Sequence, residues 1–370
     1  MNLNFKEFYV DLNKLAYGRK NGVSGILRVK NDSEFIEVCI ESCIDALDEL
    51  IIVYNDCSDN SPEIILKMKK RYPYKIKVFN YLPNIKSHDL SAEDFNEIRN
   101  VENNSIHLLS NYYNYALSKS TCKYVMKIDA DQIYFTSKLQ EICNLYRSNK
   151  YSIPTFKELF SFFKVYCHFK GCKLNCTCTN YLNYKSCVKK IIQLFKSPIS
   201  LSGINLVHDK NKWLVPLGLI TDELNILPPY NGVGDHLIFK VSPQTYFIPY
   251  NCSSYNILTS NRYTYIERLV GVRGVLPFGF IWCHMNGIRR NIYKKQLGNI
   301  QKYSDSFLSI EDFVNSRFYE LTDKIPTELL STSVRFFFEV FHDAISSSGF
   351  IKTINNLQYR YPDGLYQNHK

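Results

Sequence analysis

The stretch Tyr124-Val125-Met126-Lys127-Ile128-Asp129-Ala130-Asp131 decides the fold class of this chain. A mostly apolar run precedes the two carboxylates, which is typical of a buried β-strand that ends in polar residues. Residues two apart on a strand point to the same face, so we expect Asp129 and Asp131 to lie together. Two such carboxylates repel one another unless a positive charge lies between them. A divalent ion, Mn²⁺ or Mg²⁺, shared with diphosphate oxygens fits that need, whereas the alternative is an Asp-rich turn that caps the next helix.

Upstream of this stretch, strand-like and helix-like patterns alternate. The predicted strands are residues 25–29, 49–54, 75–81 and 124–129. One predicted helix follows Ser33, a second begins near Pro62, and a third contains Tyr112 to Ala116. This alternation predicts an α/β fold with a mostly parallel sheet covered by helices on both faces. Ligands of such sheets bind beyond the carboxyl ends of the strands, where both acidic clusters of this sequence fall.

The second acidic cluster is Asn55-Asp56-Cys57-Ser58-Asp59, at the end of the second predicted strand. A carboxylate at this place can accept a hydrogen bond from a base N–H or a ribose hydroxyl. The same residues also fit an Asx turn followed by a helix N-cap. Taken alone, the cluster does not separate a nucleotide site from a capped turn.

The composition excludes several classes of protein. Of 370 residues, 45% are hydrophobic and 15% aromatic, enough for a sizeable core and too much for a disordered chain. The net charge of +10 suits a phosphate-bearing partner, or it reflects an AT-rich genome. Neither a nucleic-acid-binding motif, a signal peptide nor an apolar run long enough to span a membrane is evident. The 12 scattered cysteines fit a reduced, cytoplasmic protein better than a disulfide framework.

Four motifs in order carry a resemblance to a known family. They are Arg28-Val29-Lys30-Asn31-Asp32, the cluster at Asn55 to Asp59, the helix Tyr112-Tyr113-Asn114-Tyr115, and Lys127-Ile128-Asp129-Ala130-Asp131. The chain resembles family 2-type GT-A glycosyltransferases over about residues 24–136. It is most similar to the bacterial lipo-oligosaccharide and capsule enzymes that transfer N-acetylgalactosamine or galactose.

This resemblance implies a donor site. Asp56 would hold the uracil or ribose, Asp131 would bind the metal, and Asp129 would contact the ribose or a metal-bound water. Arg28 would lie beside the nucleotide, and Asp59 completes the predicted site.

One position departs from the family pattern. Asn55 stands where the wider family usually has an Asp, which removes a charge and puts base recognition in doubt.

The second half supplies the remaining candidates. An inverting transfer needs a general base, and Asp235, which glycines flank, is preferred over the pair Asp222-Glu223. A turn carboxylate between two strands is the alternative interpretation of Asp235. His284 is expected as a further metal ligand because the related enzymes carry an aromatic-His pair near this place, and a hydrogen-bonded core histidine is its alternative. Lys294 or the pair Arg289-Arg290 would hold the diphosphate.

Two further segments leave alternatives open. The cysteines from Cys167 to Cys187 lack the pair spacing of a zinc site, which favours a variable loop. The basic stretch Lys189 to Lys196 fits either an anionic membrane surface or a core-facing helix with a solvated edge.

Together these features predict three regions and one activity. Residues 1–140 would bind the nucleotide sugar, 141–300 the acceptor, and 301–370 would form a helical cap. The predicted activity is metal-dependent, inverting transfer of Gal or GalNAc from a UDP-sugar to a bacterial surface glycan, such as lipo-oligosaccharide, O-antigen or capsule. The acceptor would be a glycan or lipid-linked glycan. The protein itself would be cytoplasmic or peripheral on the cytoplasmic face of the inner membrane. A sugar-phosphate nucleotidyltransferase and a non-catalytic scaffold of the same fold are the alternatives.

Overall fold

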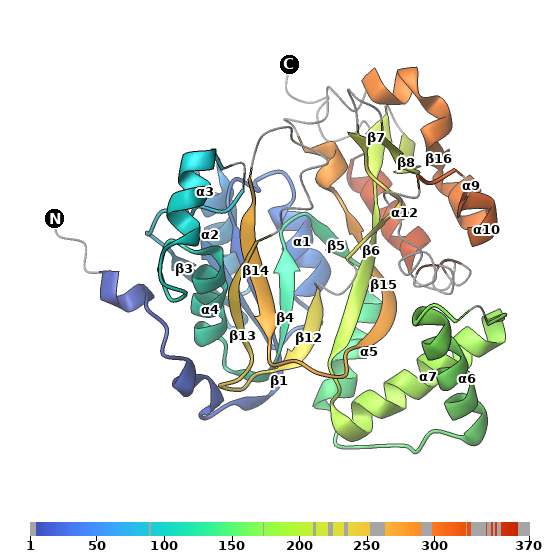
Figure 1. Ribbon diagram of the computed structural model, residues 1–370, viewed down its shortest axis with the longest axis horizontal. Helices are drawn as coiled ribbons and strands as arrows, with labels where there is room; N and C mark the ends of the chain where they lie inside the picture. The colour runs from blue at the N-terminus through green and yellow to red at the C-terminus, as the bar shows by residue number, and fades with distance from the viewer. Residues whose placement is uncertain are drawn as a thin grey trace. The chain divides into compact units, whose positions relative to one another are not determined.

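A computed structural model describes residues 5–88, 90–172, 174–209, 212–220, 225–232, 236–251, 263–289, 298–322, 324–326, 338, 342, 345 and 349–361. The chain forms two compact units (Figure 1). The first comprises residues 1–40, 47–130 and 238–275, and the second 41–46, 131–237 and 276–370. The predicted functional regions with boundaries near residues 140 and 300 stay a prediction.

The first unit is built on a mostly parallel sheet. Its strands are β1 (Lys20–Val29), β2 (Glu49–Tyr54), β3 (Ile76–Asn80), β4 (Cys122–Asp129) and β12 (Leu237–Lys240). They run in the order β3-β2-β1-β4-β12, and all neighbours are parallel except β12, which is antiparallel to β4. Consecutive residues of β1, β2 and β4 are buried, as in strands covered on both faces. The predicted α/β class is therefore confirmed.

Helices and a hairpin cover this sheet. The unit contains the short 3₁₀ turns η1 (Phe5–Phe8) and η2 (Leu12–Ala16), the start of α1 (Ile36–Cys43), and α2 (Ser61–Arg71), α3 (Ala92–Arg99) and α4 (Leu109–Lys119). α4 packs against β1 and β2, and also against the antiparallel hairpin of β13 (Tyr246–Asn251) and β14 (Tyr265–Val270) (Figure 1). The polar stretch after Pro83 contains α3, which the sequence pattern did not predict.

The second unit contains a mixed sheet. β6 (Ile199–Asn205) and β15 (Leu276–His284) are parallel, β5 (Gln132–Tyr134) is antiparallel to β15, and β11 (Tyr230–Asn231) is antiparallel to β6. A smaller sheet has the order β16-β8-β7, and β9 pairs with β10. Their bounds are β7 (Val207–Asp209), β8 (Lys212–Pro216), β9 (Leu219–Ile220), β10 (Asn225–Ile226) and β16 (Phe307–Ser309).

Two long helices of the second unit form a hairpin. The helical elements are α5 (Thr136–Arg147), α6 (Phe156–Phe169), α7 (Cys178–Phe195), η4 (Asn286–Ile288), η5 (Ser304–Ser306), α9 (Ile310–Asn315), α10 (Phe318–Thr322) and α12 (Phe350–Arg360). α6 packs on α7, and the two are joined by a short connection. The expectation of a variable loop from Cys167 to Cys187 is therefore wrong, because most of this segment is helical. Within the described residues, no helix is both long and apolar enough to cross a membrane.

Glu158 ties the two helices of the hairpin together. Its carboxylate accepts hydrogen bonds from the Thr155 backbone N–H at 2.6 Å, the Ser186 hydroxyl at 2.6 Å and the Lys190 ammonium at 2.8 Å. The Thr155 side chain accepts from the Glu158 N–H in return, which makes a reciprocal capping box at the start of α6. One buried carboxylate therefore caps α6 and pairs with α7.

We predict that Gly203→Ala destabilises the second unit. A Cβ at residue 203 would lie 1.9 Å from Nε1 of the Trp282 indole, which is fully buried. The expected loss is about 1–3 kcal/mol of unfolding free energy, measured by chemical denaturation. Gly298→Ala is the matched control, because its Cβ would meet nothing within 4 Å. Equal stability of the two variants would contradict the packing described here.

We also predict a pH-dependent role for Glu158. The Lys190 ammonium and then the Ser186 hydroxyl lower the pKa of Glu158 from 4.5 to about 2. A depressed carboxyl pKa stabilises the folded state above pH 4.5, and this contribution disappears as the pH falls toward 2. Glu158→Gln should therefore cost up to about 3 kcal/mol at neutral pH. The difference from the unsubstituted protein should shrink across that acidic window, and a difference independent of pH would contradict the assignment.

Candidate active site

Strand register brings three polar residues of the second unit together. In the antiparallel pair of β5 and β15, His284 lies opposite Gln132, next to Asp131. In the parallel pair of β6 and β15, His284 lies opposite Asn205. The backbone N–H of Met285 also donates to the Asp131 carbonyl at 2.8 Å, which fixes the two chain segments beside one another. We call Asp131, Asn205, His284 and Arg289 the Asp131 cluster.

The hydrogen bonds of the Asp131 cluster orient the imidazole of His284. Its Nδ1 lies 2.6 Å from Oδ1 of Asn205, and the Asn205 amide nitrogen donates to the Pro228 carbonyl at 2.6 Å. Because the amide nitrogen donates to Pro228, the amide oxygen faces His284 and accepts a hydrogen bond from Nδ1–H. Nε2 then points to Oδ2 of Asp131, 3.5 Å away.

Asp131 is buried and held ionised by its neighbours. Burial opposes ionisation, but the charge and hydrogen bonds of His284 and then Arg289 outweigh it and hold the pKa of Asp131 well below its usual range. Arg289 donates from Nη2 to Oδ2 of Asp131 at 2.8 Å. The cluster therefore presents a carboxylate, an imidazole and a guanidinium within contact of one another.

These residues fit a divalent metal ion in part. A carboxylate oxygen and an imidazole nitrogen are ligands of Mn²⁺, and the Asn205–His284 hydrogen bond is the kind of support that metal-binding histidines receive. Among the described residues, no group of three or more His, Cys, Asp or Glu side chains is placed to hold a metal. Two protein ligands leave the other coordination positions to water and to oxygens of a bound phosphate.

The first unit carries a second polar cluster, which we call the Arg28 cluster: Arg28, Tyr113, Lys127, Asp129 and Glu267. In the parallel pair of β1 and β4, Arg28 lies opposite Asp129 at the carboxyl ends of both strands. Arg28 Nε donates to the Tyr113 hydroxyl at 2.8 Å, and that hydroxyl lies 3.3 Å from Oδ1 of Asp129. Burial raises the pKa of Tyr113 well above its ordinary value. The hydroxyl therefore stays protonated and donates a hydrogen bond to Asp129.

The Arg28 cluster contains a buried ion pair between Lys127 and Glu267. Lys127 Nζ lies 2.8 Å from Oε1 of Glu267 on β14, and the two side chains are only 6% and 7% exposed. The same ammonium lies 5.0 Å from the centroid of the Tyr113 ring, which stacks on Phe247. Burial opposes the charge of Arg28. Its neighbours Tyr113, Asp129 and Glu267 outweigh this effect and raise the pKa of Arg28 well above the ordinary value. Arg28 is therefore a fixed cation at the strand end.

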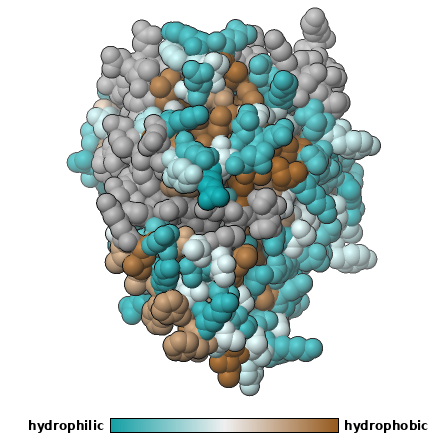
Figure 2. Space-filling model, turned by 90° about the vertical axis from the view of Figure 1, so that its right-hand side faces the viewer, coloured by the Kyte–Doolittle hydropathy of each residue, from teal (hydrophilic) through white to brown (hydrophobic). Residues whose placement is uncertain are grey.

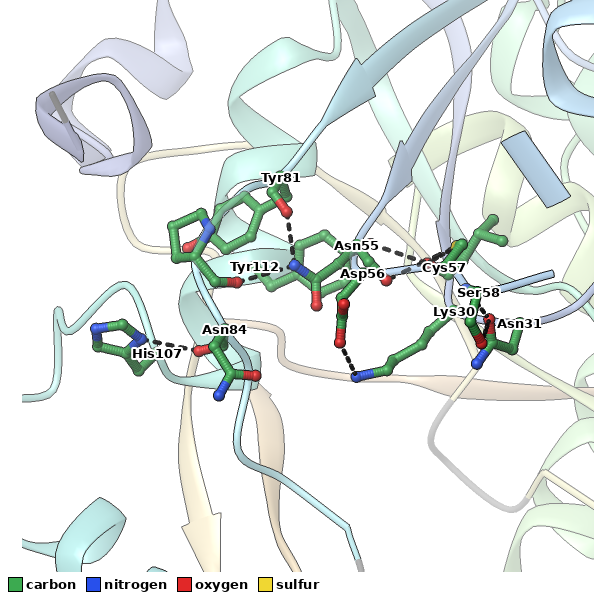
Figure 3. Close-up of polar contacts among 12 residues, drawn as sticks. Lys30, Asn31, Asn55, Asp56, Cys57, Ser58, Tyr81, Asn84, His107 and Tyr112 are labelled. Carbon is green, nitrogen blue, oxygen red and sulfur yellow. Dashed lines mark hydrogen bonds and ion pairs between the residues drawn. The ribbon is translucent and has the colours of Figure 1, made fainter. Parts of the chain in front are cut away.

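The loop after β2 holds Asn55 and Asp56 in different environments (Figure 3). Asn55 is buried, and its amide nitrogen donates to the carbonyls of Tyr81 at 2.6 Å and Pro83 at 2.8 Å. Asp56 has a left-handed backbone (φ 45°), and its exposed carboxylate lies 3.2 Å from Lys30 Nζ. Asn55 therefore holds the loop after β3, a task for which an Asp lacks the donors, while Asp56 remains open to a ligand.

Asp59 is used by the protein backbone. Its two carboxylate oxygens accept from the N–H groups of Ser33 at 2.9 Å and Ser61 at 3.0 Å. Burial opposes this, but the hydrogen bonds from Ser61 and then Ser33 lower the pKa of Asp59. These contacts are those of the capped turn named as the alternative from sequence, and the donor-site role of Asp59 stays a prediction.

Several sequence candidates lie outside the described residues. These are Asp222, Glu223, Asp235, Arg290 and Lys294. Their predicted roles as general base or diphosphate ligand stay predictions.

The sequence analysis missed four residues that complete the two clusters: Tyr113, Lys127, Asn205 and Glu267. Lys127 stands in a quoted motif, but its side chain was given no role. Tyr113 belongs to a motif that was recognised, but its hydroxyl was given no role. Asn205 ends β6, a strand that was not predicted. Glu267 is one of many charged residues of the second half, and nothing in its local sequence signals a buried partner at Lys127.

Comparison with known proteins relates the chain to one family. Residues 11–185, just under half of the chain, match the family model of beta-1,4-N-acetylgalactosaminyltransferase (CgtA). This match confirms the predicted resemblance: over these residues the chain is similar to the CgtA glycosyltransferases. No curated protein matches the chain.

Solved structures overlap with the chain only in part. One is glucosyl-3-phosphoglycerate synthase from Mycobacterium tuberculosis in complex with Mn²⁺, UDP and glucosyl-3-phosphoglycerate. It is 19% identical, with a TM-score of 0.21, over 33% of this chain and 37% of that one. The same enzyme with Mg²⁺ and UDP matches at 17% identity, with the same TM-score and coverage. The chain thus spans little more than a third of the length of these structures.

We predict that Asn55→Asp destabilises the first unit. The new carboxylate would face the carbonyl oxygens of Tyr81 and Pro83 with no hydrogen to donate, at a cost of about 1–3 kcal/mol. The loss, measured by chemical denaturation, should shrink as the pH falls and the carboxyl gains a proton. Asp56→Asn is the matched control on the exposed neighbour and should leave stability within about 0.5 kcal/mol. A variant as stable as the unsubstituted protein at neutral pH would show that Asn55 does not hold the loop.

Proposed function

We propose that this chain, through its relation to the CgtA type, is a glycosyltransferase that moves a sugar from a UDP-sugar to a bacterial surface glycan. The donor sugar we propose is galactose or N-acetylgalactosamine, transferred with inversion onto a glycan or lipid-linked glycan such as lipo-oligosaccharide, O-antigen or capsule. The reaction would take place in the cytoplasm. The observation that carries the proposal is the pairing of Asp131 with an oriented His284, in a chain whose first half matches a transferase family.

The Arg28 cluster supports the donor side of this proposal. Arg28 and Asp129 lie at the carboxyl ends of neighbouring parallel strands, the edge at which sheets of this type bind ligands. Asp56 follows β2, which pairs with β1 in the same sheet, and its carboxylate is exposed. We assign Asp56 to the uracil or ribose, Asp129 to the ribose, and Arg28 to the neighbourhood of the nucleotide.

The Asp131 cluster supports binding of a divalent metal. We propose that Asp131 Oδ and His284 Nε2 hold Mn²⁺ or Mg²⁺. The ion would stabilise negative charge on the nucleotide diphosphate as it leaves. Asn205, in contact with Nδ1 of His284, orients the ring so that Nε2 faces Asp131, and the Arg289 guanidinium offers charged donors to a diphosphate oxygen.

The acceptor side is proposed from the sequence. Deprotonation of the acceptor hydroxyl requires a base, and Asp235 remains the proposed one, with Glu223 as the second choice. Both residues lie outside the described part of the chain.

We predict that Asp131→Asn abolishes turnover but not folding. The variant keeps the size of the side chain and loses the charge, so UDP release from UDP-GalNAc or UDP-Gal with Mn²⁺ should fall at least about 100-fold. The measurement is UDP release and product formation by purified protein over a panel of UDP-, GDP- and CMP-sugars with a lipid-linked glycan acceptor. Chelation of the metal should have the same effect on the unsubstituted protein.

Asp305→Asn is the matched control, because it makes the same chemical change at an exposed position of the second unit. It should keep full activity. Binding of UDP without transfer, unaffected by Asp131→Asn, would favour a scaffold. Formation of a nucleotide sugar from a sugar phosphate would instead favour a nucleotidyltransferase.

A further inference from the structure

One face of α6 is apolar and exposed. Phe156, Leu159, Phe160 and Phe163 have 86%, 38%, 61% and 63% of their surface exposed. Their spacing of i, i+3, i+4 and i+7 places them within about 100° of one another around the helix. Figure 2 shows apolar side chains at the lower end of the face it presents, over the α6–α7 hairpin. We call these four residues the α6 face.

The opposite side of α6 holds the hairpin together. Glu158, Ser161, Val165 and His168 are buried, and Glu158 pairs with Lys190 on α7. Phe162 stacks on Tyr184 of α7, with ring centroids 5.6 Å apart. The aromatic side chains of the α6 face are therefore not needed to pack α6 on α7. Exposed aromatic groups gathered in this way mark an interaction surface rather than scattered exposure.

The apolar surface continues at the open end of the hairpin. Ser152 Oγ lies 3.5 Å from Gln193 Oε1, so the segment before α6 runs beside the last turn of α7. Tyr151, Ile153 and Phe195, at this same end, are 70%, 76% and 74% exposed.

The hairpin also carries a large positive charge. Residues 150–196 contain nine Lys, one Glu and neither Asp nor Arg, which gives a formal charge of +8 out of +10 for the whole chain. The single Glu, Glu158, is buried and paired. Lys150, Lys157 and Lys170 are exposed, and Lys157 and Lys170 lie on α6 or at its end. The outer surface of the hairpin is thus apolar and positively charged, with no exposed acidic side chain among its described residues.

The sequence analysis left residues 189–196 open between an anionic membrane surface and a core-facing helix. Lys189 and Lys190 form ion pairs with Glu141 and Glu158, and Ile192 is buried. These residues match the alternative of a core-facing helix with a solvated edge. The exposed apolar side chains gather on α6, which the sequence analysis did not recognise as a helix.

We propose that the α6 face docks the protein on an anionic lipid bilayer. The three Phe side chains would enter the boundary between headgroups and acyl chains, and the exposed lysines would face anionic headgroups. A lipid surface is the one partner that uses both features, since nucleic acid offers phosphates without an apolar layer for this helix. A second copy of the chain would bring the same positive charge against itself. The docking is independent of the donor chemistry and brings the protein to a surface where a lipid-linked acceptor would be presented.

The experiment is vesicle flotation of the full chain. Vesicles of phosphatidylethanolamine and phosphatidylglycerol serve as the anionic surface, and phosphatidylcholine vesicles as the neutral one. The unsubstituted protein should float with the anionic vesicles and much less with the neutral ones. The triple variant Phe156→Ser, Phe160→Ser, Phe163→Ser should lower the partition coefficient at least about 10-fold. Lys157→Gln and Lys170→Gln should each lower it about fivefold at low salt.

A matched control removes three exposed aromatic side chains elsewhere. Tyr17, Tyr74 and Tyr359 are 79%, 96% and 87% exposed, and their joint replacement by Ser should leave flotation unchanged. A Phe160→Trp variant adds a direct readout, because Trp213 and Trp282 are buried. Its emission should shift to the blue with anionic vesicles and be quenched by brominated acyl chains.

Each other outcome overturns the proposal. Equal flotation of the triple variant would show that the α6 face does not bind the bilayer. Equal binding to neutral vesicles would show that the positive charge does not contribute to binding. A concentration-dependent dimer that the triple variant abolishes would assign the face to a second copy. Binding to single-stranded RNA with no flotation would assign the charge to nucleic acid. UDP release without vesicles should be the same in the triple variant, so failure of docking and failure of the proposed transfer are measured separately.

Discussion

A charged group that leaves water must find an opposite charge or several hydrogen bonds close by, and both polar clusters of this protein are arranged by that requirement. In the first unit, Lys127 and Glu267 neutralise one another almost out of contact with solvent. Their pairing leaves Arg28, Tyr113 and Asp129 at the strand ends with a chain of two polar contacts. In the second unit, Asp131 would be costly to bury without His284 and Arg289. Charge compensation thus fixes the side chains that the proposed chemistry would use.

The two clusters differ in how much of their charge is already satisfied. The Lys127–Glu267 pair is closed, with both partners buried, and suits a supporting role. The Asp131 carboxylate instead concentrates its contacts on Oδ2, which both His284 and Arg289 approach. Asn205 holds the His284 ring at the nitrogen that faces away from Asp131. An oriented imidazole beside a buried carboxylate is the arrangement that the proposed metal site requires.

The sequence predicted the first unit better than the second, and the reason is the range of the interactions. Apolar runs such as residues 49–54 and 124–129 identify β2 and β4, because a parallel strand that is buried on both faces has apolar residues at consecutive positions. The partners of Asp131 lie more than 150 residues further along the chain, and no local pattern links them. Asn55 shows the opposite case: what looked like a missing charge of the donor site is an amide that holds two backbone carbonyls. Only the folded contacts distinguish these two roles.

The α6–α7 hairpin shows why an exposed apolar face can be separated from folding. Its stability comes from the buried side: a capping box at Thr155, the Glu158–Lys190 pair and the stacked rings of Phe162 and Tyr184. A helix so held does not need aromatic residues on its outer face, and exposing three Phe side chains to water gains nothing for the folded monomer. Among the described residues of the hairpin no acidic side chain is exposed, which favours an anionic partner over a protein surface of mixed charge. An apolar face beside exposed lysines is complementary to an anionic, lipid-like surface, and the buried side of the hairpin leaves that face free to meet it.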